Sequence, residues 1–128
     1  MIFGIGTDRV VIDRIAHSLA RFDQRFVQRI YTKSEYKHAC KHQNKARRLA
    51  MMFAAKEATV KAIGTGFVGD IRPRDVEVDY LESGQPILHL HAGVAEAAQA
   101  RGISQMHLSL SDDGGVAIAF VVAEKDLI

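Results

Sequence analysis

Hydrophobic positions in the first part of the chain predict one short strand followed by a long amphipathic segment. Ile2 to Thr7 has the pattern of a strand that contains two glycines and ends at Asp8. From Ile12 to Ile30 the apolar residues recur every three or four positions, which is typical of a helix with one buried face. The pattern allows a break near Asp23.

Two further helices are indicated by the residues that precede them. Thr32 and Glu35 have the spacing of a capping box, which predicts a helix from Lys33 to about His42. Asn44 is a favourable N-cap for a longer helix over Lys45–Ile63. This second helix is the longest element that the pattern predicts.

Alternation of apolar and polar residues replaces the helical pattern in the second half. Residues 76–80 and 87–90 flank a glycine–proline turn and predict a hairpin, and residues 106–111 and 116–123 predict another. A helix over Val94–Ala100 separates the two hairpins. We therefore expect an α+β fold with an antiparallel sheet and a long central helix.

Composition is that of a globular protein. The 128 residues are 48% hydrophobic and 25% charged, which fits one domain over residues 1–128. No apolar run reaches the roughly 18 residues of a membrane span, and no signal segment begins the chain, so we expect a cytoplasmic protein without a membrane partner. Cys40 is the single cysteine and is expected to be structural.

Charge is divided unevenly along the chain. Residues 1–74 hold 15 Lys and Arg against 6 Asp and Glu, whereas residues 75–128 hold 2 against 9. A basic first half favours an anionic partner such as nucleotide phosphates, nucleic acid or an acidic protein. Solvated helix faces would also carry such charges.

Three charged residues are candidates for chemistry. Glu57 and Lys61 lie four apart on the long helix and share one face, as an ordinary surface ion pair would. Asp8 ends a glycine-containing strand, where it either caps the next helix or projects into a cleft. Together, Asp8 and Glu57 supply the oxygen ligands that Mg²⁺ prefers, although their spacing does not show that they meet.

Glycines follow the long helix directly. Gly64 is suited to a left-handed C-cap, and the Gly64-Thr65-Gly66 run would let a ligand approach the backbone. This is not a Walker phosphate loop, because that motif places Lys and Ser or Thr after the glycines, at a helix N-terminus.

Arginines and one histidine complete the candidates. Arg14, Arg21 and Arg25 fall on one stripe of a continuous helix and could bind acidic side chains of a protein partner. Nucleic acid is not expected, since the charges lack interleaved aromatic residues and a recognised binding motif. His107 shares a predicted strand face with Ser109.

Several blocks together are similar to one family. The runs Gly4-Ile5-Gly6-Thr7-Asp8, Phe53-Ala54-Ala55-Lys56-Glu57-Ala58, Lys61-Ala62 and Gly64-Thr65-Gly66 resemble the bacterial holo-acyl-carrier-protein synthases in order and spacing. Gly84-Gln85-Pro86-Ile87-Leu88 and His107-Leu108-Ser109-Leu110-Ser111 look like later blocks of that family. The resemblance thus covers essentially the whole chain.

The resemblance implies a fold, a reaction and partners. The fold is that of the 4'-phosphopantetheinyl transferases, assembled as a homotrimer with sites between subunits. The reaction, a step of fatty acid biosynthesis, moves the phosphopantetheine arm of coenzyme A to a serine of acyl carrier protein and releases adenosine 3',5'-bisphosphate. Asp8 and Glu57 are expected to hold Mg²⁺, and Lys61 to contact phosphate. Glu57 is the expected base, through a metal-held water, with Asp8 as the alternative.

The same resemblance assigns the binding residues. Gly64, Thr65, Pro86 and His107 match the coenzyme A pocket, and Arg14, Arg21 and Arg25 match a carrier-docking helix. Two positions depart from the family. Met52 stands where an arginine is usual, so we expect Arg48, one turn earlier, to supply that phosphate contact; Asp112 stands where many members have histidine, and no role is carried to it.

The sequence is also compatible with three other functions. A basic nucleic-acid-binding module would need no Glu57. A broader-range transferase for peptidyl or polyketide carriers is commonly about twice this length, since it holds two similar halves in one chain. An inactive family member is favoured only by Met52.

Overall fold

The computed structural model describes residues 1–127 and contains five helices, one short 3₁₀ turn and five strands within that range. The helices are α1 (Ile12–Phe22), α2 (Gln24–Ile30), α3 (Lys33–Cys40), α4 (Lys45–Ile63) and α5 (Ala92–Ala100). The strands are β1 (Ile2–Val11), β2 (Val76–Tyr80), β3 (Pro86–Leu90), β4 (Ile103–Asp113) and β5 (Val116–Lys125), with the 3₁₀ turn η1 at Pro73–Asp75. The expected α+β class is confirmed.

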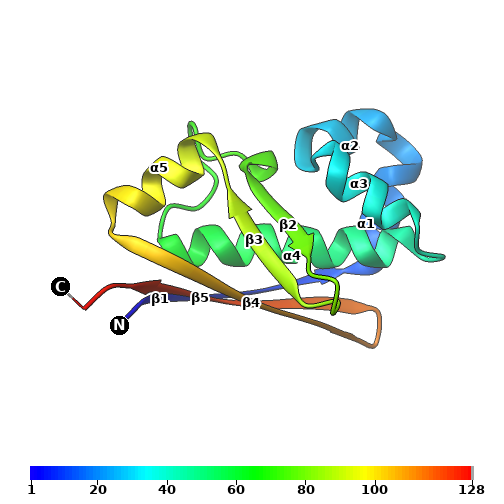
Figure 1. The fold of residues 1–128 in the computed structure, drawn as a ribbon. Helices are drawn as coiled ribbons and strands as arrows, with labels where there is room; N and C mark the ends of the chain where they lie inside the picture. Colours follow the sequence, from blue (N-terminus) through cyan, green and yellow to red (C-terminus); the bar gives the residue numbers. More distant parts are fainter. Residues whose placement is uncertain (128) are drawn as a thin grey trace.

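The strands form two antiparallel sheets. β5 lies between β1 and β4 in a three-stranded sheet, while β2 and β3 form a separate hairpin. Helix α4 runs along the larger sheet, with α1, α2 and α3 gathered near one end and α5 near the other (Figure 1). The expected long central helix is therefore present.

The caps read from the sequence are all present. Thr32 Oγ1 accepts the Glu35 N–H at 3.1 Å, and Glu35 Oε1 accepts the Thr32 N–H. The Asn44 side chain accepts the Arg47 N–H, and Gly64 ends α4 in the left-handed region at φ 96°. Local chemistry thus sets the bounds of α3 and α4.

Three boundaries differ from the sequence prediction. β1 continues to Val11 because residues as far as that one pair with β5, so Asp8 lies within the strand and neither ends it nor caps a helix. α5 begins at Ala92, two residues earlier than expected. β4 begins at Ile103, and the turn into β5 is only Gly114 and Gly115, both with positive φ.

The first amphipathic segment is not one helix. Asp23 has φ 48° and separates α1 from α2. The expected single stripe of Arg14, Arg21 and Arg25 is therefore wrong, because Arg25 lies on a second helix whose axis changes direction. All three side chains are nevertheless exposed.

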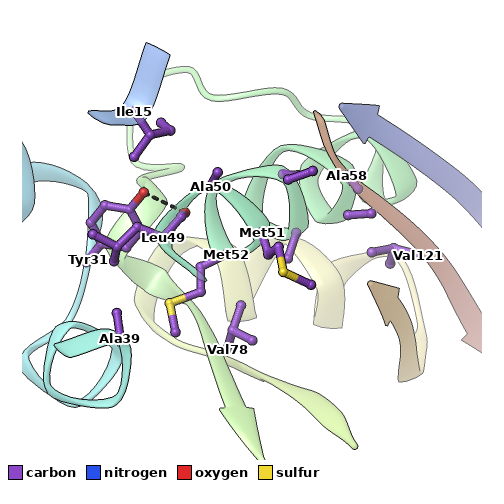
Figure 2. Close-up of a cluster of buried hydrophobic side chains, with 14 of the residues drawn as sticks. Ile15, Tyr31, Ala39, Leu49, Ala50, Met51, Met52, Ala58, Val78 and Val121 are labelled. Atoms are coloured by element: carbon purple, nitrogen blue, oxygen red, sulfur yellow. Dashed lines mark hydrogen bonds between the residues drawn. The ribbon is translucent and has the colours of Figure 1, made fainter. Parts of the chain in front are cut away.

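The core lies between α4 and its neighbours. Figure 2 shows Leu49 next to Tyr31, whose hydroxyl donates to the Leu49 carbonyl oxygen at 2.8 Å, with Met51 and Met52 further along α4 in the same cluster. Alanines fill the contact with the sheet, because α4 lies too close to it for larger side chains. Cys40 is exposed on α3 and does not belong to this core.

Candidate functional site

Two glycines bring β1 directly against α4. Gly4 and Gly6 face the helix. A Cβ on Gly4 would overlap the carbonyl oxygen of Ala62, and a Cβ on Gly6 would overlap that of Ala58. Side chains alternate along a strand, so the next residue on this face is Asp8. The close approach of the two backbones therefore brings Asp8 to the surface of α4 that carries Glu57 and Lys61.

Lys61 and Asp8 form an ion pair. The Lys61 ammonium lies 3.1 Å from Asp8 Oδ1 and donates to the Thr7 carbonyl oxygen at 3.0 Å. The Asp8 side chain is 18% exposed and that of Lys61 is 52% exposed. Lys61 is thus the more exposed partner of the pair and the one that can turn toward a ligand.

Glu57 is half-buried beside this pair. Burial raises the pKa of its carboxyl, the negative charge of Asp8 raises it further, and Lys61 partly offsets the effect. A carboxylate whose ionisation is opposed by a neighbouring carboxylate is a favourable place for a cation. Among residues 1–127, no cluster of three or more His, Cys, Asp and Glu could hold a metal.

A cavity of about 370 Å³ opens over the carboxylates and is lined in part by Asp8, Glu57, Arg14, Ser18 and Phe53. Ser18, Phe26 and Phe53 also line a second cavity of about 420 Å³ between α1 and α2. Phe22 and Ile30 make this second cavity apolar, and Arg25 and Arg29 contribute positive charge to its lining. We call it the arginine groove. Sequence reasoning missed Arg29 and the phenylalanines, because the groove exists only once the chain breaks at Asp23.

The glycine run lies at the far end of α4. The N–H groups of Gly64, Thr65 and Gly66 all point at the Val60 carbonyl oxygen, at 2.9, 3.0 and 3.3 Å. Thr65 Oγ1 is buried without a hydrogen-bond partner within the described residues. A buried hydroxyl of this kind is costly unless a ligand or water satisfies it, so Thr65 fits a ligand-binding role.

Two expected site residues, His107 and Pro86, lie away from the Asp8 cavity. His107 lies on the sheet face opposite Asp8, exposed, with Nε2 2.9 Å from Glu124 Oε1. Pro86 begins β3 in the separate hairpin. One chain therefore does not bring these residues to the Asp8 cavity.

Arg48 lies near the start of α4. Its guanidinium is 5.3 Å from the centre of the Tyr80 ring, and its Nε is buried without a partner in the described part of the chain. Nine residues separate it from Glu57, which is about 13 Å along a helix and half a turn around it. Met52 is fully buried in the core, so neither residue reaches the cavity within one chain.

Comparison with known proteins shows the family of this chain. Residues 4–121 match the model of the 4'-phosphopantetheinyl transferase superfamily. The chain is 46% identical over 122 residues to a holo-[acyl-carrier-protein] synthase of Halorhodospira halophila, covering 95% of this chain and 97% of that one. The chain belongs to this superfamily.

Solved structures show the same fold. The holo-[acyl-carrier-protein] synthase of Neisseria meningitidis superposes with a TM-score of 0.89 at 38% identity, covering 98% of this chain and all of the other. The Helicobacter pylori enzyme, solved in complex with coenzyme A, gives a TM-score of 0.82 at 32% identity over 94% of this chain and 99% of its own. The expected phosphopantetheinyl-transferase fold is confirmed.

Proposed function

We propose that this protein transfers the 4'-phosphopantetheine moiety of coenzyme A to a serine of apo acyl carrier protein, as a step of fatty acid biosynthesis in the cytoplasm. The observation that carries the proposal is the Asp8–Lys61 ion pair beside Glu57. Asp8 and Glu57 line a cavity that shares Ser18, Phe26 and Phe53 with the arginine groove. Its closest test is the mass of a carrier protein after incubation with the chain and coenzyme A.

Asp8 and Glu57 fit a magnesium ion. Both are carboxylates, the ligand type that Mg²⁺ prefers, and the ion usually keeps water and substrate phosphate oxygens at its other positions. When bound, the ion would neutralise charge on the pyrophosphate of coenzyme A. The rise in the pKa of Glu57 that the Asp8 charge causes supports this assignment.

The reaction forms one phosphorus–oxygen bond and breaks another. The carrier serine oxygen attacks the phosphorus next to pantetheine, the bond to the second phosphate breaks, and adenosine 3',5'-bisphosphate leaves with that electron pair. Lys61 would leave Asp8 to contact a phosphate oxygen. The serine proton goes to the Glu57 carboxylate, which lines the cavity beside Asp8; Asp8 is the alternative.

The arginine groove fits the carrier protein. An apolar floor with Phe22 and Phe53 would take an apolar side chain of a helix, while Arg25 and Arg29 would pair with its acidic residues. Arg14 lines the adjoining cavity and Arg21 lies beside Phe22. The groove leads to Asp8 and Glu57, so a carrier docked there would hold its serine near the proposed base.

A second copy of the chain would complete the coenzyme A pocket. The sheet face that carries His107 also exposes Ile5, Ile118 and Phe120, which are 59%, 41% and 42% exposed. A contiguous apolar face of this kind is typical of a subunit interface. We infer a homotrimer in which His107 and Pro86 of one subunit act with Asp8, Gly64 and Thr65 of another; whether Arg48 contacts phosphate is part of this proposal.

A further inference from the structure

A fully buried ion pair lies one residue before Glu57. Lys56 and Glu35 have fully buried side chains, and the Lys56 ammonium is 2.8 Å from Glu35 Oε1. Lys56 also donates to the carbonyl oxygens of Pro73, at 2.9 Å, and Val76. All three donors of the ammonium are therefore used.

Glu35 is equally well satisfied. Oε1 also accepts the Thr32 N–H at 2.9 Å, and Oε2 accepts the Val78 N–H at 2.8 Å. The pair thus joins α3, α4, η1 and β2. A buried ion pair adds little stability compared with apolar residues of the same shape, so its contribution lies in specifying where the bonded backbone must lie.

Lys56 binds the backbone at the C-terminal end of the loop of residues 64–72, which begins with the Gly64-Thr65-Gly66 run. Residues 64–72 have neither helix nor strand, and η1 follows them directly. The loop is fixed at its start by the three N–H groups that point at Val60. In its middle, Asp70 packs on Gly93 so closely that a Cβ there would overlap the Asp70 carbonyl. Lys56 provides the third attachment, at Pro73.

We propose that Lys56, charged and paired with Glu35, is a positioning residue for the loop of residues 64–72. It fixes the loop that presents Gly64 and Thr65 relative to Glu57 and Lys61, because the same helix carries the anchor and the chemistry. The inference rests on the proposed function, since Thr65 is taken to contact coenzyme A. Lys56 itself touches no substrate.

The test uses the full chain with Lys56→Met and Glu35→Gln together, so that no lone charge stays buried. We expect the KM for coenzyme A to rise roughly 5- to 10-fold, equivalent to about one lost hydrogen-bond interaction. The turnover number and the KM for carrier protein should change less than about twofold. Amide hydrogen exchange should accelerate in residues 64–75 before it does so in β1, β4 or β5.

Met51→Ala is the matched control, because Met51 is buried in the main core and contacts neither Lys56's partners nor the loop by any hydrogen bond. Each variant is measured at the same fraction of its own melting temperature. Equal changes in the KM for coenzyme A and in loop exchange in both variants would overturn the proposal. So would an unchanged KM for coenzyme A together with unchanged exchange. If the double variant does not fold, Lys56→Gln with Glu35→Gln, which keeps a neutral hydrogen-bonding amide at each position, should show the same pattern at smaller size, and an unchanged loop there would reject the idea. If wild-type protein transfers nothing, the proposed function fails, and loop exchange still decides whether Lys56 is the anchor.

Discussion

Lys61 Nζ lies 3.1 Å from Asp8 Oδ1, joining a helix to a strand that is more than fifty residues away in sequence. The contact exists because Gly4 and Gly6 leave no side chain between β1 and α4. Glu57, one turn before Lys61 on the same helix, completes the group. This small arrangement of residues is the basis of the proposed chemistry.

Electrostatic coupling between the two carboxyls gives the first prediction. Asp8→Asn removes the negative charge that helps to raise the pKa of Glu57, so that pKa should fall. Lys61→Met should raise it, since Lys61 opposes the shift. Carbon-13 NMR titration of the Glu57 carboxyl in metal-free buffer measures both changes. A Glu57 pKa that stays constant or rises in Asp8→Asn would show that the carboxyls do not interact.

Close packing at Gly6 gives the second prediction. Gly6→Ala forces β1 away from Ala58 and should lower the free energy of unfolding by about 1–3 kcal/mol. Gln99→Ala is the control, because Gln99 is exposed on α5, away from β1 and from the sheet face proposed as the interface, and should change stability by less than about 0.5 kcal/mol. Urea unfolding of both variants decides the point, and equal stability would mean that β1 and α4 are not in close contact.

Charge at the arginine groove gives the third prediction. Arg25→Glu should raise the KM for acyl carrier protein about tenfold or more, equivalent to about 1.4 kcal/mol, and leave the KM for coenzyme A unchanged. The effect should shrink at high salt. Arg101→Glu, just after α5, changes the net charge by the same amount at an exposed position outside the groove and should leave the KM for acyl carrier protein unchanged. Equal effects from both variants would point to net charge and would reject docking at the groove.

The positions of Asp8 and His107 on opposite faces of the sheet give the fourth prediction. Asp8→Ala and His107→Ala each remove one part of a site that we place between subunits, so each variant alone should transfer little phosphopantetheine. Mixing and reassembling the two should restore activity, because some interfaces then combine an intact Asp8 with an intact His107. Sedimentation of Phe120→Glu tests the interface separately: it should dissociate the oligomer. A mixture no more active than its components would place the whole site within one chain.

Local signals made the helices and the site motifs predictable. The capping box at Thr32, the cap at Asn44 and the stop at Gly64 each depend on neighbouring residues alone, and each is found where expected. Asp8, Glu57 and Lys61 were identified by resemblance, and the structure brings them together. Their meeting could have been anticipated from alternation, because Gly4, Gly6 and Asp8 share one face of a strand.

Long-range features were not predictable. The extension of β1 to Val11 depends on pairing with β5, more than a hundred residues later. The arginine groove depends on a backbone break at Asp23, which hydrophobic spacing alone does not fix. Lys56 lies within a recognised motif, yet its pairing with Glu35 appears only when α3 packs on α4.

Mass spectrometry of the carrier protein measures the proposed phosphopantetheine transfer itself. Apo acyl carrier protein is incubated with this chain, coenzyme A and magnesium, with parallel samples that contain a chelator or the Glu57→Ala variant. We expect the carrier to gain the mass of one phosphopantetheine arm with the wild-type chain, and not to gain it with chelator or with the variant. No gain with the folded wild-type chain and a competent carrier would contradict the proposed transfer, and an undiminished gain with Glu57→Ala would contradict the role of Glu57.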